Sequence, residues 1–551
     1  MRSHVRLATL ALVLVGAAPA AQELGTIAFP TSGAPAAQPA FLDGVKALHS
    51  FQFDEAAEAF RRAQQADSGF ALAYWGEAMS YNHPLWAQQD VEAATAVLER
   101  LAPTHEARLA KARLPKEKAL LEAMQHLYFS PGDKLARDRA YSETMARLHA
   151  QWPGDHEIAA FYALSLLGTV RPGDTGFRRQ ALAASIAQKV FAENPKHPGA
   201  AHFVIHSFDD PEHAPLALPA ANAYAAIAPA AAHALHMPSH IYVQLGMWDR
   251  VAASNTEAYK AAVDVIKRLK LPEGREDFHT LSWLAYSNLM LGRFDEAKRN
   301  VDVAHETAGR NRSSRGVRNG YLAMRARHIL ETGRWETIAL DGVAPAGGDA
   351  HAHMPGMPGM AASDPSNAWV FIAGVSAAKL GDRATAEAAE ARLRAAREKA
   401  RADGDAYRAK EIAILEKEVG AVTRFAAGRT DEALRLAKEA VDIEATTDAP
   451  SGPPDPMKPA LELYGDLLLE AGRPAEAAAA YAQSLLRTPK RTPSLVGVAR
   501  ASARAGDTTA ARRHYAEIAA MPGAAPNAPA VLEAQKFLKA PATEAGRRSR
   551  V

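Results

Sequence analysis

The sequence predicts an all-α protein built as a solenoid of paired helices, and three observations support this prediction. The chain of 551 residues is 48% hydrophobic but only 7% aromatic, which is typical of Ala-rich helices that pack closely. Glycine turns recur between segments with helical apolar spacing, as at Leu245–Asp249 and Leu291–Phe294. The turn glycines Gly472 and Gly506 are 34 residues apart, which is a known period of helical-hairpin repeats.

The glycine turns continue along most of the chain. Near the N-terminus, Phe53–Ala57 and Ala73–Ala78 have the same helix, turn and helix pattern. These segments resemble tetratricopeptide repeats, from about Phe41 to about Leu538. The resemblance implies a right-handed superhelix of helical hairpins, whose concave groove is the surface that binds a protein or peptide partner. The turn glycines are Gly246, Gly292, Gly333, Gly381, Gly428, Gly472 and Gly506.

The N-terminus has the layout of a cleaved secretory signal. Arg2 and Arg6 precede or flank an apolar run, Leu7–Val15, and small residues follow up to Ala20. We therefore expect residues 1–20 to be removed and the mature protein to be periplasmic or secreted. No later stretch is apolar for long enough to cross a membrane, and the chain has no cysteine for lipid attachment. No membrane anchor is predicted.

The remaining chain divides where the repeat pattern is interrupted. Proline and glycine steps are incompatible with a helix and predict an exposed loop, whereas a polar terminus without a pattern is expected to fray. The predicted segments are an N-terminal solenoid at 38–339, a loop rich in His and Met at 340–367, C-terminal repeats at 368–538 and a frayed tail at 539–551.

Charge and motifs exclude several classes of function. Lys and Arg total 64 against 62 for Asp and Glu, so the net charge is only +2, and no nucleic-acid partner is predicted. The sequence has no Gly-rich phosphate loop, no Gly-x-Ser-x-Gly elbow and no His-Glu-x-x-His motif. These absences leave open whether the protein is an enzyme.

Histidines cluster in one part of the chain, where seven of the 20 lie between positions 197 and 240. His202 and His206, like His236 and His240, are four residues apart and therefore share a helix face. The two pairs are separated by one 34-residue period, so they are expected on neighbouring helices whose axes are ~8 to 10 Å apart. Four imidazoles at one seam predict a site for a transition metal.

Other polar residues are predicted to surround this site. Counting from the turn glycines places His233 and His279 side by side, as further ligands or as acid–base groups. Asp209 and Asp210 end the first histidine helix and are candidates for orienting an imidazole. Tyr286 is predicted to lie beside His240. The candidate catalytic residues are His233, His279, Asp209, Asp210 and Tyr286.

The histidine segment also resembles a known kind of sequence block. It runs from Pro198 through Asp209-Asp210-Pro211 to the stretch His233–Ile241. A similar block occurs in a group of exported bacterial tetratricopeptide proteins. This resemblance implies a shared site but no particular reaction.

A second set of candidate ligands lies in the predicted loop. Two histidines and three methionines occur within ten residues, and the methionines recur every three positions. Thioethers select Cu(I), and imidazole also accepts Cu(II). The loop resembles the methionine-rich segments of periplasmic copper-handling proteins, so copper is favoured over zinc or iron. The candidate loop ligands are His351, His353, Met354, Met357 and Met360.

Three functions are consistent with these features. The first is an exported solenoid that binds a transition metal through His202, His206, His236 and His240 in its concave groove, for metal handling or metal-dependent chemistry. The second is an enzyme that uses the metal or the imidazoles on a small substrate in the groove. The third is an interaction scaffold whose His-lined groove binds a peptide.

Overall fold

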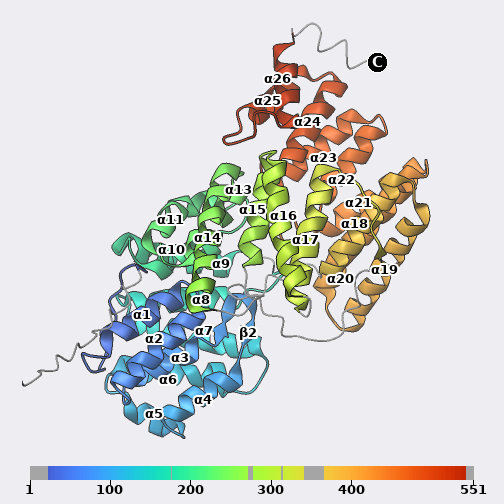
Figure 1. Ribbon diagram of the computed structural model, residues 1–551. Helices are drawn as coiled ribbons and strands as arrows, with labels where there is room; N and C mark the ends of the chain where they lie inside the picture. The colour runs from blue at the N-terminus through green and yellow to red at the C-terminus, as the bar shows by residue number, and fades with distance from the viewer. Residues whose placement is uncertain (1–22, 175, 271–276, 312–313, 341–364, 541–551) are drawn as a thin grey trace, which may run out of the picture.

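The protein is described by a computed structural model, and its described residues are almost entirely helical (Figure 1). This confirms the predicted all-α class and its arrangement as a solenoid of helical hairpins. The predicted signal peptide and the loop residues His351–Met360 lie outside the described residues. The described ranges are 23–174, 176–270, 277–311, 314–340 and 365–540.

The helices follow one another from the blue end of Figure 1 to the red end. The first group comprises α1 (Gln38–His49), α2 (Phe53–Ala66), α3 (Ala71–Met79), α4 (Val91–Leu101), α5 (His105–Lys111), α6 (Pro115–Tyr128), α7 (Lys134–Gln151), α8 (His156–Leu167) and α9 (Arg178–Glu193). After α3, the antiparallel pair β1 (Asn82–His83) and β2 (Gln88–Gln89) encloses the short helix η1 (Pro84–Trp86).

The other helices form two further groups. The middle group comprises α10 (Pro198–Ser207), α11 (Ala214–Ile227), α12 (Ala232–His236), α13 (Pro238–Gln244), α14 (Trp248–Leu269), α15 (Phe278–Met290), α16 (Phe294–Arg310) and α17 (Arg315–Thr332). The last group comprises α18 (Pro365–Leu380), α19 (Arg383–Ala402), α20 (Ala406–Ala426), α21 (Thr430–Glu444), α22 (Ala460–Glu470), α23 (Pro474–Arg487), α24 (Thr492–Ala505), α25 (Thr508–Ala519) and α26 (Pro529–Lys539).

The predicted glycine turns join the two helices of a hairpin. All seven turn glycines have a positive φ, between 62° and 87°, a conformation that is unfavourable for other residues. Gly246 illustrates a second requirement, because a Cβ atom there would lie 2.4 Å from the Cβ of Lys490. This turn therefore also allows the C-terminal repeats to approach closely.

Two prolines set helix boundaries near the predicted sites. Helix α18 begins at Pro365, two residues before the predicted end of the loop at 367, because proline is well tolerated in the first turn of a helix. Pro238 separates α12 from α13 at Met237, since proline cannot donate the backbone hydrogen bond that a continuous helix needs. The predicted pair His236 and His240 thus spans a break between two helices.

The histidine-bearing helices belong to the largest apolar core of the described residues. This core extends from Leu24 to Ala297 and includes parts of α10 to α15. The C-terminal repeats contain separate, smaller cores. The clustered histidines are consequently held by the largest apolar core of the described residues, and side chains in a close-packed core have well-defined positions.

Candidate metal centre

The structure brings six histidines together in two adjacent groups of three. His202 and His206 from α10 join His233 from α12, and we call this group the first triad. The second triad consists of His236 from α12, His240 from α13 and His279 from α15. Within each triad, the nitrogens that could bind a metal all lie within 4.8 Å of one another.

The Nε2 atoms converge in both triads. In the first, the Nε2 atom of His202 lies 3.0 Å from those of His206 and His233. In the second, the Nε2 atom of His236 lies 3.1 Å from that of His240 and 3.0 Å from that of His279. Three nitrogens bound to one metal at 2.0 to 2.1 Å in tetrahedral directions would be separated by about 3.3 Å. Two of the three pairs in each triad are close to that spacing.

The two triads adjoin each other. The ring centroids of His206 and His240 are 6.0 Å apart, and those of His233 and His236 are 6.3 Å apart. The prediction of four ligands around one metal thus differs from the structure, which assigns each predicted pair to a different triad with its own third histidine.

Hydrogen bonds at Nδ1 fix the orientation of three of the rings. His202 donates from Nδ1 to the backbone oxygen of His49 at 2.7 Å. His240 donates from Nδ1 to the Asp209 carboxylate at 2.6 Å. His236 donates from Nδ1 to the Asn255 side-chain oxygen at 2.6 Å. The orientation of that amide is itself set, because the Asn255 nitrogen donates to the Val251 carbonyl at 2.8 Å.

These bonds have a direct consequence for the Nε2 atoms. A neutral imidazole carries one proton, so a ring that donates from Nδ1 has a lone pair at Nε2. His236 and His240 both donate from Nδ1, and their Nε2 lone pairs therefore face each other across 3.1 Å. Two lone pairs at that distance repel unless a cation lies between them. A proton or a metal ion between the two nitrogens would remove this repulsion.

Burial favours the neutral, metal-binding form of the rings. Desolvation, followed by repulsion from neighbouring imidazoles, holds the pKa well below its usual value. Metal binding needs deprotonated imidazole, so little energy is lost to proton release. The histidines with a lowered pKa are His202, His206, His233, His236 and His279.

Aromatic rings enclose the two triads. Phe51 lies 4.3 Å from the His202 ring and Trp283 lies 4.5 Å from the His240 ring. His202, His236 and His240 are at most 2% exposed, so they do not line an open groove as predicted. The tetratricopeptide resemblance placed these histidines on the concave face. Nothing in the sequence reveals that Phe51 and Trp283 cover them.

A third buried group lies beside the first triad and holds it in place. Glu157 binds His49 Nε2 at 2.8 Å and His197 Nε2 at 3.1 Å, and the two interactions lower the pKa of Glu157 to about 2 despite its burial. His197 Nδ1 accepts a bond from the backbone nitrogen of Ala200 in the first turn of α10. The Nδ1 atom of His197 is thus already hydrogen-bonded to the backbone. The backbone oxygen of His49 orients the His202 ring. We therefore interpret this group as a support.

The other predicted residues are distributed as follows. Asp209 contacts the second triad through His240, whereas Asp210 binds His213 at 2.9 Å. The Tyr286 hydroxyl accepts a bond from Arg491 at 3.0 Å, so its polar group belongs to another network. The loop residues predicted to bind copper lie outside the described residues.

The predicted neighbours of His279 require a correction. His279 was expected beside His233, but it contacts His236, while His233 contacts His202. The expectation counted residues back from Gly246 along one continuous helix. Met237 keeps helical dihedrals, φ −54° and ψ −34°, although α12 and α13 are divided there. The neighbours of His279 are therefore set by how α15 packs against α12, which a count along one helix does not contain.

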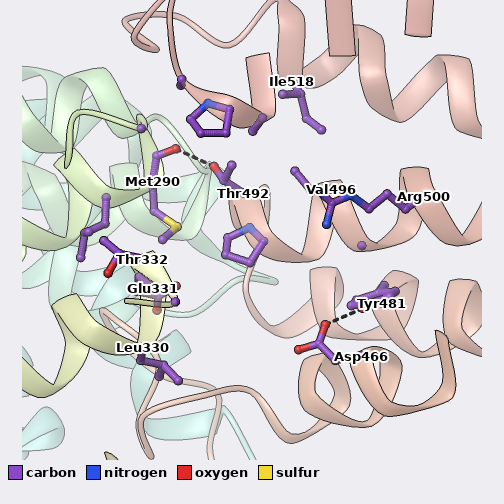
Figure 2. A pocket seen from close by; sticks show the side chains of 18 of the residues that line it. Met290, Leu330, Glu331, Thr332, Asp466, Tyr481, Thr492, Val496, Arg500 and Ile518 are labelled. Carbon is purple, nitrogen blue, oxygen red and sulfur yellow. Dashed lines mark hydrogen bonds between the residues drawn. The ribbon is translucent and has the colours of Figure 1, made fainter. Parts of the chain in front are cut away.

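A separate cavity of about 860 Å³ lies among the C-terminal repeats and α15 to α17. Figure 2 shows Val496 and Ile518 beside Thr492, with the Thr492 hydroxyl donating to the Met290 backbone oxygen at 2.6 Å. On another wall, Tyr481 donates to Asp466 at 2.5 Å. The cavity is thus mainly apolar with a few oriented polar groups, and sequence analysis did not identify it.

Sequence reasoning also missed four residues of the histidine site, which are His49, Glu157, Asn255 and Trp283. Glu157 follows an Asp N-cap in an apolar helix, and a carboxylate at a fully buried position requires a partner. The position of Glu157 in an apolar helix could therefore have identified it as a candidate site residue. Nothing in the local sequence distinguishes Asn255 or His49.

Neither a known family model nor a curated protein matches the sequence. Solved structures to which the chain is similar include human IFIT1 bound to PPP-AAAA, with 10% identity and a TM-score of 0.35 over 88% of this chain and 90% of that one. The Cut9–Hcn1 hetero-tetramer of the APC/C has 12% identity and a TM-score of 0.32 over 95% and 78%. Yeast Tom70 has 13% identity and a TM-score of 0.27 over 94% and 96%. The fold assignment rests on the helices described above.

Among the residues that the structure describes, no helix combines the length and apolar character needed to cross a membrane.

Proposed function

We propose that this protein is an exported, tetratricopeptide-like solenoid that binds two transition-metal ions, one in each histidine triad. The observation that supports this most strongly is the pair of Nε2 lone pairs of His236 and His240, which face each other at 3.1 Å. The basic and apolar N-terminal segment supports export to the periplasm.

Charge favours copper among the metals that imidazole binds. The triads themselves contain only neutral ligands, and Asp209 is the carboxylate that contacts one of them. Two divalent ions would place four positive charges in a buried site, whereas two Cu(I) ions place two, and buried charge without compensation is costly. Zinc and iron are the alternatives. The methionines of the predicted loop favour copper independently.

The proposal is tested by removing one triad. The double variant His236→Ala and His240→Ala is expected to bind one copper ion where the wild type binds two, because the first triad keeps all its ligands. Copper would be measured by elemental analysis after dialysis, and helix content by circular dichroism. The matched control is His105→Ala, which removes a histidine that binds Glu122 at the surface. Two ions in the double variant, with unchanged helix content, would contradict the assignment.

The C-terminal cavity supports a second function, which is binding of an apolar peptide segment. The apolar wall around Val496 and Ile518 would hold its side chains. This binding is expected to be insensitive to chelators, because the cavity and the triads share no residue. Val496→Glu is expected to abolish capture of a peptide ligand selected from a library on the wild type. Capture that depends on bound metal would count against this function.

A further inference from the structure

The two triads share features that a pair of separate storage sites does not need. They adjoin through His206 and His240 on one side and through His233 and His236 on the other. One helix, α12, supplies a ligand to each triad. Two ions held in this way would be neighbours.

Each triad offers a metal three protein ligands. Three protein ligands are typical of metal sites that keep a position open for a substrate, whereas structural sites are closed by four. Neither triad includes a carboxylate. His206, His233 and His279 are only partly buried, in contrast to His202, His236 and His240. The partly buried histidines therefore mark the side of each triad that lies nearer to solvent.

The charge of the site limits which ligand can bind. The six imidazoles are neutral when they bind metal, and two Cu(I) ions add two positive charges. If each copper loses one electron to a shared ligand, the ligand gains two negative charges and the copper gains two positive ones. The net charge of the buried site does not change, so the reaction requires no additional counter-ion.

Resting on the proposed function, we propose that the two triads hold a pair of Cu(I) ions that binds one molecule of dioxygen between them. Two Cu(I) ions held by the triads would each give one electron to the dioxygen and become Cu(II). The two electrons would reduce dioxygen to peroxide and leave an oxygen–oxygen single bond. No proton is taken up and no other reductant is needed.

The residues around the triads fit this two-electron step. The Asp209 carboxylate binds the Nδ1 proton of His240, which makes His240 a stronger donor toward the more highly charged Cu(II). Asn255 and the His49 carbonyl hold His236 and His202 in place. Phe51 and Trp283 exclude water from one side, which protects bound peroxide from protonation.

The test uses the mature protein loaded with Cu(I) without oxygen and then exposed to dioxygen. We expect uptake of one dioxygen for every two coppers, a new charge-transfer absorption band, and no electron paramagnetic resonance signal, because the bridged Cu(II) spins cancel. His279→Ala is expected to lose the band and show the signal of isolated Cu(II). The control His305→Ala, at an exposed position of α16, should behave as wild type.

The outcomes separate this inference from the proposed function. Two bound coppers that take up no dioxygen, or that give the full signal of two independent Cu(II) ions, would overturn the paired reaction and leave metal binding intact. A protein that binds no copper would overturn both. Because the wild type alone gives the decisive spectrum, the result does not depend on how the variant folds.

Discussion

At the scale of single residues, the hydrogen-bond partner of each Nδ1 atom decides what the histidine site can do. The spacing of His202, His206, His236 and His240 was sufficient to predict that they lie close together. Asp209, the partner of His240, was among the residues predicted to orient an imidazole. Asn255 was not predictable, because it follows His236 by 19 residues and lies on another helix. A single asparagine in a helix has no pattern that reveals its neighbour, which depends on how the helices pack.

Replacing Asn255 by Ala should weaken metal binding in the second triad. The variant removes the acceptor that keeps the Nδ1 proton of His236 in place, and loss of such a partner typically lowers metal affinity by about 10- to 100-fold. Competition with a chelator of known affinity would measure the change. Asn300→Ala is the matched control, since Asn300 binds Asn288 and no histidine. Unchanged affinity in Asn255→Ala would show that the ring needs no support.

At the scale of elements, the sequence predicted the hairpins better than it predicted their interruptions. The turn glycines mark hairpins correctly because their positive φ is a local requirement. The predicted neighbour of His279 was wrong because the contact of His279 with His236 depends on how α15 packs against α12. Helix α18 likewise began earlier than composition indicated. Local chemistry thus determines turns, whereas contacts between helices depend on the whole stack.

Glu411 in helix α20 should make the stability of the protein depend on pH. Burial, followed by repulsion from Asp455, raises the pKa of Glu411 to about 8 from the usual 4.5. The folded state therefore holds this proton more tightly than the unfolded state does, and stability falls as pH rises between these two values. At pH 4, Glu411→Gln should have the same melting temperature as wild type. At pH 9, its melting temperature should be higher than that of wild type.

The control for this prediction is Glu387→Gln, which removes an exposed carboxylate that binds Arg383. It should leave the difference between acidic and alkaline melting temperatures as it is in wild type. Thermal melting of the metal-free protein at both pH values gives the comparison. Equal melting of Glu411→Gln and wild type at pH 9 would show that Glu411 ionises freely in the folded protein.

At the scale of the whole molecule, the C-terminal repeats fold back onto the helices that carry the second triad. Arg491 is fully buried and binds Glu462 of α22, Glu331 of α17 and the hydroxyl of Tyr286 on α15. Trp248 adds a hydrogen bond to the Lys490 backbone oxygen at 2.9 Å. Except for the bond to Glu462, these contacts connect positions at least 160 residues apart, and no local pattern in the sequence predicts them.

Replacing Arg491 by Met should destabilise the protein strongly. The variant leaves Glu462 and Glu331 buried without this partner, and breaking a buried ion pair on one side costs about 3 to 5 kcal/mol. Urea unfolding would measure the loss. Arg383→Met removes an exposed pair with Glu387 and should cost less than about 1 kcal/mol. Equal effects of the two substitutions would mean that Arg491 does not join the two parts of the chain.

The most direct test of the metal centre is elemental analysis of the untagged mature protein, purified from a periplasmic extract. The two triads predict about two copper ions per chain, and a chelator strong enough to remove them should leave a protein that binds two again. A protein that is isolated without metal and takes up neither copper nor zinc would contradict the account, because the facing lone pairs of His236 and His240 would then need another explanation.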